Sequence, residues 1–169
     1  MGGVDFEAIY GAYFSDVYFY MLHLCRDQHM AEELTSETFF RALRAIGKFR
    51  GDCDVRVWLC RIARNCYAAH QKRAARVSPA GDDALEALPA KGPPVAEQVA
   101  ARDTAARLQA LLHTLPDPYK EVFLWRVYGE LSFRQIGQLF EKTENWACVT
   151  YHRARAMLQQ RWEDCDHDA

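Results

Sequence analysis

The stretch SFRQIGQLFEKTENWACVTYHRAR, residues 132–155, decides the fold of the C-terminal half of the chain. It opens with Ser132, a residue type that caps helix N-termini, and apolar side chains then follow at helical spacing. These side chains are Ile136, Leu139 and Phe140. A tight turn is predicted at 141–143, followed by a second helix over about 144–161 that is basic beyond its first turns. Two helices joined in this way form the helix-turn-helix pattern.

The second helix of this pair is amphipathic. Its core face is predicted from small and apolar residues spaced i, i+4, i+7 and i+11, which are Ala147, Tyr151, Ala154 and Leu158. The side chains expected on the outward face and its flanks are Asn145, Cys148, His152, Arg153 and Arg155. The helix therefore presents a partly basic surface, with a cysteine on the exposed side.

Helical periodicity continues on both sides of a proline-rich segment. Residues 77–98 contain four of the six prolines and no aromatic residue, so a flexible linker is predicted there. Half of the 169 residues are hydrophobic, enough for a core on each side. We expect an all-α protein of two small helical domains, 1–76 and 99–162, with an acidic tail at 163–169.

Charge is strongly segregated although the formal net charge is only -2. Residues 1–40 hold seven acids against one base, whereas residues 41–76 hold ten bases against two acids. The basic block is interleaved with aromatic side chains, which indicates a nucleic-acid-binding surface.

The helix predicted at 30–46 has two distinct faces. Its buried stripe is predicted to be Ala31, Leu34, Thr38, Ala42 and Ile46. The second face carries Glu33, Ser36, Glu37, Phe40, Arg41 and Arg44. An outward-pointing Phe flanked by ordered charges is typical of a partner surface rather than of a solvated face.

A turn and helix cap are predicted at Gly51 and Asp52, and a helix then runs to about residue 73. Its predicted core stripe is Val55, Trp58, Leu59, Ile62, Ala63 and Cys66. The opposite stripe is Arg61, Arg64, Asn65, Ala68 and Lys72. Basic side chains on one face can follow phosphates, and an Asn among them can read a base edge.

The cysteines give little support for a metal site. No CxxC pair occurs among Cys25, Cys53, Cys60, Cys66, Cys148 and Cys165, and we expect free thiols in a reducing cytosol. No apolar run is long enough to cross a membrane, and the acidic start lacks the features of a signal peptide, so a cytoplasmic location is expected. With no nucleophile triad, carboxylate pair or phosphate loop, we expect neither catalysis nor a cofactor.

Four blocks of the sequence, in order and spacing, resemble the extracytoplasmic-function group of bacterial sigma factors. They are AEELTSETFFRALRAI, FRGDCDVRVWLCRIARN, LHTLPDPYKEVFLWRVYGELSFRQIGQLF and WACVTYHRAR. The resemblance implies a transcription initiation factor that binds core RNA polymerase, reads the minus-35 and minus-10 promoter elements and helps to open the strands. It also implies control by an anti-sigma factor, expected to be membrane-anchored.

The resemblance also implies roles for residues of the first domain. The helix face Glu33, Ser36, Glu37, Phe40 and Arg41 matches the one that docks on the coiled coil of the polymerase large subunit. The loop Phe49, Arg50, Gly51 and Asp52 matches the one that captures a base flipped from the minus-10 element. Asn65 matches a base-contacting position, and Arg61, Arg64, Lys72 and Arg73 would lie along the opened strand.

In the second domain, Arg126, Phe133 and Arg134 match positions that touch the DNA backbone. The minus-35 contacts implied for the recognition helix are Asn145, Cys148, Val149, His152, Arg153 and Arg155. The chain departs from the family pattern twice. Glu141 stands where relatives often have a turn Gly, and Cys148 stands where relatives usually carry Arg or Lys.

Two other interpretations stay open. An ordinary helix-turn-helix regulator would explain residues 116–161 but leaves the basic block 48–73 and the Phe40 face without a role. A metal or thiol site would use Cys148 and His152, one helical turn apart, with Cys165 and His167 as further ligands.

Overall fold

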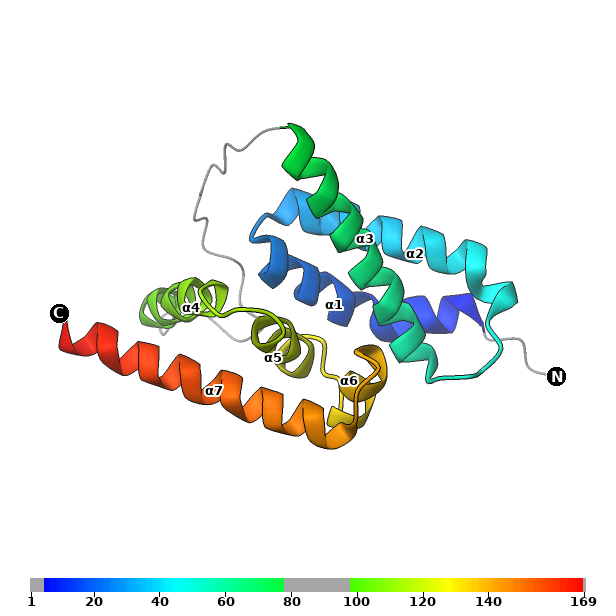
Figure 1. Cartoon of the computed structure of the whole chain (residues 1–169). Coiled ribbons are helices and arrows are strands. Elements are labelled where there is room, and N and C mark those ends of the chain that lie inside the picture. The colour runs from blue at the N-terminus through cyan, green and yellow to red at the C-terminus, as the bar shows by residue number, and fades with distance from the viewer. Residues whose placement is uncertain (1–4, 78–97, 169) are drawn as a thin grey trace.

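The computed structural model describes residues 5–77 and 98–168, and every regular element in these ranges is helical (Figure 1). The N-terminal domain consists of α1 (Phe6–Cys25), α2 (Gln28–Ala45), the short 3-10 helix η1 (Ile46–Lys48) and α3 (Val55–Val77). The C-terminal domain consists of α4 (Gln98–His113), α5 (Tyr119–Val127), α6 (Phe133–Leu139) and α7 (Glu144–His167). The all-α prediction is confirmed, whereas nearly all of the predicted linker lies outside the described residues.

A tight reversal brings α2 back along α1. Arg26 ends α1 in the left-handed conformation, with its N–H donating to the Leu22 carbonyl oxygen. Asp27 caps α2 by accepting a hydrogen bond from the Met30 N–H. The helices then pack through an aromatic cluster centred on the buried Phe39, which is surrounded by Phe6, Tyr10 and Phe14. Phe39, which the predicted stripe of this helix omitted, is thus a core residue.

The start of α3 differs from its prediction. Gly51 has φ +77, as expected for a turn, but the capping residue is Asp54 and not Asp52. The Asp54 carboxylate accepts from the Arg56 N–H, so the helix begins at Val55. The core stripe of α3 is also shifted, because the helix packs against both α2 and α6. Its fully buried residues are Val57, Leu59, Cys60, Ala63 and Cys66.

The C-terminal domain contains the predicted helix-turn-helix, formed by α6 and α7. Ser132 and Gln135 make a reciprocal capping box at the start of α6, and Thr143 caps α7 by accepting from the Trp146 N–H. Between the helices Glu141 adopts a left-handed conformation with φ +56. Gly137 lies so close to the turn that an added Cβ would be 2.8 Å from the Thr143 carbonyl oxygen.

Helix α7 continues six residues beyond its predicted end at Arg161. Side-chain hydrogen bonds one turn apart, Gln159 to Glu163 and Gln160 to Asp164, support this extension. Arg107 of α4 also forms a 2.6 Å ion pair with Asp166. Residues 163–167 of the predicted acidic tail are therefore helical. Across 5–77 and 98–168, the helices lack the combination of length and apolar content that crossing a bilayer requires.

Candidate functional site

The outer face of α2 presents an exposed aromatic side chain among charges. Phe40 is 59% exposed, and the Arg44 guanidinium lies 5.8 Å from its ring centre. Arg41 forms a 2.6 Å ion pair with Glu37. The neighbouring Leu43 is 50% exposed and extends the apolar surface, although the sequence interpretation did not include it. Glu33 and Ser36 are also exposed. All five residues predicted for polymerase binding thus lie on α2. We call these five residues, together with Leu43 and Arg44, the α2 surface.

The loop before α3 is largely exposed. Arg50, Gly51 and Asp52 are exposed, while Phe49 is half-buried with its ring 5.2 Å from that of Trp58. The aromatic contact anchors one end of the loop, so the three residues after it project into solvent.

The basic side of α3 divides into two groups. Asn65 and Lys72 are exposed. Arg61 and Arg64 are half-buried, because they turn toward the C-terminal domain. The structure therefore does not place all predicted minus-10 residues on one free surface.

The recognition helix has the outward face that its periodicity predicts. Ala147, Ala154 and Leu158 are buried, together with Thr150, which the predicted core face did not include. The exposed residues are Asn145, Val149, His152, Arg153 and Arg155, and Cys148 is half-buried beside them. The predicted minus-35 residues of α7 are thus brought together along one side of the helix.

A small aromatic cluster joins the other predicted minus-35 residues to α7. The Phe133 ring lies 5.5 Å from that of Tyr151 and 6.1 Å from that of His152. The Arg126 guanidinium lies 4.6 Å from the Phe133 ring centre and donates to the Leu131 carbonyl oxygen at 3.1 Å. Arg126 is thereby held beside the recognition helix. Arg134 is exposed on α6.

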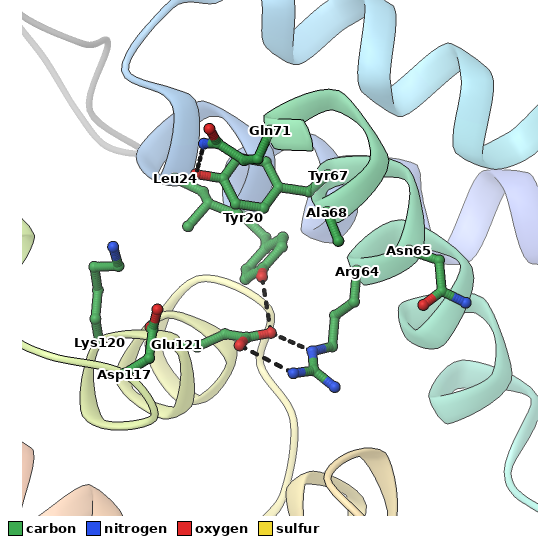
Figure 2. Close-up of a pocket in the computed structure, with 10 residues that line it drawn as sticks. All are labelled: Tyr20, Leu24, Arg64, Asn65, Tyr67, Ala68, Gln71, Asp117, Lys120 and Glu121. Carbon is green, nitrogen blue, oxygen red and sulfur yellow. Dashed lines mark hydrogen bonds and ion pairs between the residues drawn. The ribbon is translucent and has the colours of Figure 1, made fainter. Parts of the chain in front are cut away.

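The two domains meet at a carboxylate, Glu121 of α5. Figure 2 shows Arg64 of α3 and the hydroxyl of Tyr20 of α1 converging on it. The Arg64 Nη2 to Glu121 Oε2 distance is 3.1 Å, and a second guanidinium nitrogen donates to Oε1. The Trp125 indole N–H also donates to this carboxylate at 3.4 Å. Tyr20, Arg64 and Glu121 line a cavity of about 490 Å³ between the domains.

Burial and charge fix the protonation states at this junction. Burial first, and then the negative charge of Glu121, raise the pKa of Tyr20 well above its ordinary value, so its hydroxyl stays protonated and can donate. Burial alone would lower the pKa of Arg64, but the hydrogen bond and charge of Glu121 raise it overall. Arg64 therefore remains a charged guanidinium in this contact.

Two further arginines of α3 cross the junction. Arg56 forms a 2.9 Å ion pair with Asp16 of its own domain and donates to the Gly129 carbonyl oxygen at 2.7 Å. Arg61 donates to the Gln138 carbonyl oxygen at 2.8 Å. Asp54, at the start of α3, accepts from the Gln135 side chain at 2.9 Å. The N-terminal half of α3 is thus docked against the C-terminal domain.

Comparisons with known proteins agree with this architecture. The family model for Sigma-70 region 2 matches residues 9–77, and that for Sigma-70 region 4 matches residues 105–158. The ECF RNA polymerase sigma factor SigM of Bacillus subtilis is 29% identical over 90% of this chain and 92% of its own length. The chain belongs to the extracytoplasmic-function sigma factors.

One further sequence relative and one solved structure are similar to this sigma factor. The ECF RNA polymerase sigma factor BldN of Streptomyces coelicolor is 32% identical over 94% of this chain and 61% of that protein. The solved structure of the sigma factor RpoE from Bartonella quintana, in complex with the anti-sigma factor NepR, has a TM-score of 0.74 at 16% identity. That match covers 94% of this chain and 97% of the other, and it shows a shared fold.

The metal-site interpretation of this sigma factor is not supported by its geometry. In 5–77 and 98–168, no three His, Cys, Asp or Glu side chains gather in a way that could hold a metal ion. Cys165 lies 17 residues after Cys148 on the same helix, which separates them by roughly 25 Å. Burial, with a smaller contribution from Asp27, raises the pKa of Cys25 to about 12, and burial also raises the pKa of Cys60. These two thiols remain protonated and are poor nucleophiles or ligands.

Proposed function

We propose that this sigma factor recruits core RNA polymerase through the α2 surface and reads promoters with two separate DNA-binding surfaces. The observation that carries the proposal is the exposed Phe40, framed by Arg41 and Arg44 on a helix whose other face is fully packed. A large aromatic side chain left in solvent among ordered charges supports a role as the anchor of a protein interface.

The minus-10 surface of the proposal is the loop 49–52 together with the exposed side of α3. Arg50, Gly51 and Asp52 are accessible to a flipped base, and Asn65 is accessible to a base edge. Arg61, Arg64 and Lys72 would follow the phosphates of the opened strand. Opening of the promoter strands would be favoured because the captured base gains hydrogen bonds and stacking contacts, which offset the loss of its base pair.

The minus-35 surface of the proposal is the outward side of α7. Asn145, Val149, His152 and Arg153 would enter the major groove, with Cys148 at the flank. Backbone contacts are assigned to Arg126, Phe133, Arg134 and Arg155. The cluster of Arg126 with Phe133 supports this assignment, because it holds a cation beside the recognition helix.

The proposed partners are core RNA polymerase, promoter DNA and an anti-sigma factor. The fold is shared with RpoE, which was solved in complex with an anti-sigma factor, and with CnrH, solved in complex with the cytosolic domain of CnrY. The CnrH match has a TM-score of 0.67 at 19% identity, over 94% of this chain and 88% of the other. We expect the anti-sigma factor here to be membrane-anchored and the sigma factor to act in the cytoplasm, without catalysis, cofactor or small-molecule substrate.

Run-off transcription tests the proposal directly. Purified protein is mixed with core RNA polymerase and fragmented genomic DNA, and the expected result is a set of transcripts that core enzyme alone does not make. Absence of promoter-dependent transcripts, under conditions where a known sigma factor directs them, would overturn the main proposal.

Phe40→Ala tests the polymerase surface. Loss of an interface anchor costs about 2 kcal/mol or more, so we expect retention on immobilised core polymerase to fall by about thirtyfold. Val127→Ala is the matched control, because Val127 is also an exposed apolar side chain but lies in the C-terminal domain. Retention that is unchanged in the Phe40 variant would favour an ordinary helix-turn-helix regulator.

A further inference from the structure

The recognition helix α7 has two flanks, and the proposed backbone contacts lie beside one of them. A helix with its side chains is about 10–12 Å across and the major groove is about 12 Å wide, so both flanks of an inserted helix face a sugar–phosphate backbone. The proposed backbone contacts Arg126 and Phe133 adjoin α7 at Tyr151 and His152. The opposite flank faces the other DNA strand and has no assigned backbone contact.

The opposite flank opens onto a cavity of about 490 Å³ between the start of α5 and the start of α7. Trp146, Thr150 and Arg153 line it at the spacing i, i+4 and i+7, which places them on one side of α7. Tyr119 lines it from α5, and the exposed Asn145 completes this part of the lining. We call this space the α5–α7 cavity. Its volume is within the range of sites that hold a small ligand.

Thr150 is a buried polar side chain of this cavity that lacks a partner. It is 5% exposed, and its hydroxyl makes no hydrogen bond with any residue of 5–77 or 98–168. Thr38 of α2 is also buried, but its hydroxyl donates to the Leu34 carbonyl oxygen at 2.7 Å. An unpaired hydroxyl inside a protein costs free energy, so we expect the occupant of the cavity to offer Thr150 a polar atom.

The other polar side chains of the α5–α7 cavity are rich in hydrogen-bond donors. The Tyr119 hydroxyl and the Arg153 guanidinium form no hydrogen bond or ion pair within the part of the chain that the structure describes. The nearest acids in the sequence, Asp117 and Glu144, are not among the lining residues. The described lining thus offers a cation and hydroxyl groups, and it contains no carboxylate that would repel an anion.

The N-terminus of α7 adds to this positive environment. Thr143, which also lines the cavity, accepts from the Trp146 N–H through its hydroxyl oxygen and from the Ala147 N–H through its carbonyl oxygen. The N–H groups of Glu144 and Asn145 have no acceptor within 5–77 and 98–168. Free N–H groups at a helix N-terminus, together with the helix dipole, favour an anion.

We propose that the α5–α7 cavity receives a backbone phosphate of the DNA strand opposite to the one that Arg126 and Phe133 contact. Tyr119 and Thr150 donate hydrogen bonds to the phosphate oxygens, and Arg153 supplies the positive charge. The inference rests on the proposed function for the insertion of α7 into the major groove. It adds Tyr119 and Thr150 to the minus-35 surface and clamps the recognition helix between both strands.

Removing the two hydroxyls tests the proposal. Tyr119→Phe and Thr150→Val should each weaken binding to a duplex that carries the minus-35 element found by run-off transcription. The expected loss is about threefold to tenfold, because a hydrogen bond to a charged acceptor disappears. Thr150→Ser keeps the hydroxyl and should bind like the wild-type protein. Tyr128→Phe, the same change at the other end of α5 beside His23, is the matched control and should also bind normally.

Thermal unfolding separates a DNA contact from a structural role. Thr150→Val replaces an unpaired buried hydroxyl with a methyl group, so its unfolding midpoint should equal or exceed that of the wild-type protein. Weaker binding accompanied by a lower midpoint would assign Thr150 to the packing of the domain and would overturn its role as a phosphate donor.

Methylphosphonate substitution locates the phosphate. A fluorescent minus-35 duplex is prepared with one neutral methylphosphonate at a time, in either strand. One position should weaken wild-type binding, and this penalty should be about threefold smaller for the double variant Tyr119→Phe with Thr150→Val. The same cycle with Arg126→Gln identifies the phosphate beside Arg126. The two phosphates should lie on opposite strands.

The remaining outcomes separate the inference from the proposed function. Coupling of Tyr119 and Thr150 to no phosphate, or to one on the strand that Arg126 contacts, would overturn the inference. It also fails if inorganic phosphate shifts the nuclear magnetic resonance signals of Thr150 while neither substitution changes duplex affinity, because the cavity then takes a free anion.

A failure of the proposed function has a different signature. If run-off transcription gives no promoter, a duplex of random sequence becomes the probe, because phosphate contacts do not depend on base sequence. A threefold loss of affinity for Tyr119→Phe on that probe would leave the phosphate site standing without the promoter function.

Discussion

Glu141 is an unfavourable residue for the conformation that it occupies. Its φ of +56 places it in the left-handed region, where a side chain with a Cβ is strained by about 1 kcal/mol. Glu141 lies in the turn that joins α6 to α7. The presence of Glu instead of the turn Gly at position 141 therefore concerns the stability of the turn rather than a DNA contact.

Glu141→Gly should relieve this strain and stabilise the C-terminal domain by less than about 1 kcal/mol, because the greater conformational freedom that Gly gives the unfolded chain offsets part of the gain. Thermal unfolding followed by circular dichroism measures the change. Glu141→Ala retains a Cβ and is expected to give little gain. Equal midpoints for the Gly and Ala variants would show that the turn is not strained.

Gly137 is required for a steric reason rather than a conformational one. An added Cβ would lie 2.8 Å and 2.9 Å from the carbonyl oxygens of Thr143 and Lys142, which are backbone atoms that cannot rotate away. Gly137→Ala should therefore destabilise the protein by about 1 to 3 kcal/mol and weaken duplex binding. Gly47→Ala is the control, because a Cβ there meets no atom within 4 Å. A neutral Gly137 variant would contradict the close approach of turn and helix.

Among the helices, α7 carries the half-buried Cys148 beside the exposed residues that we propose to enter the major groove. Cys148→Arg should strengthen minus-35 binding or shift the preferred base there, with a discrimination of about 1 to 3 kcal/mol for a bidentate guanine contact. Binding across a promoter library measures both effects. Cys165→Arg adds the same charge at the exposed far end of the helix and should not change base preference. Unchanged preference in the Cys148 variant would show that this position does not face the groove.

The helices and their faces could largely be predicted from the sequence, because periodicity and capping are local. Ser132, Phe40 and the outward side of α7 illustrate this. The start of α3 was misplaced by two residues because Asp52 and Asp54 are both plausible caps. The end of α7 was placed six residues too early, although local side-chain hydrogen bonds support the last turns; the contact of Asp166 with Arg107, 59 residues away along the chain, has no local signal.

The junction between domains could not be predicted in the same way. Tyr20 and Glu121 are separated by 101 residues, and Arg64 and Glu121 by 57. A basic stripe on a helix has the same pattern whether it faces water, DNA or a second domain. Glu121 itself lies in a helix in which four of the other eight residues are buried, and nothing local distinguished it as a partner for Arg64.

At the scale of the whole molecule, the docking of the two domains on each other should depend on pH through His113. Its imidazole Nε2 lies 2.9 Å from the His23 carbonyl oxygen across the junction. Burial first, and then the charges of Arg26, Lys120 and His23, lower the pKa of His113 below its ordinary 6.5, although the backbone hydrogen bond opposes this. Well above pH 6.5 the group is neutral whether the two domains are docked or separated. As the pH falls, the separated form takes up the proton first, so the docked form loses stability.

Scattering at about pH 7.5 and about pH 5.5 should therefore show a larger radius of gyration at the lower pH. His113→Gln keeps a side-chain donor but cannot titrate, and its radius should change less. If both proteins expand equally, a group other than His113 is responsible for the pH dependence.

The acceptors used by the α3 arginines have an evolutionary consequence. Arg56 and Arg61 bond to the main-chain oxygens of Gly129 and Gln138, which any amino acid at those positions would supply. A substitution at Gly129 or Gln138 therefore cannot remove either of these hydrogen bonds directly. Glu121 is different, because its carboxylate belongs to a side chain that a single codon change can replace. Natural selection could thus adjust the docking of the two domains through position 121, while the two main-chain contacts of Arg56 and Arg61 persist through changes at positions 129 and 138.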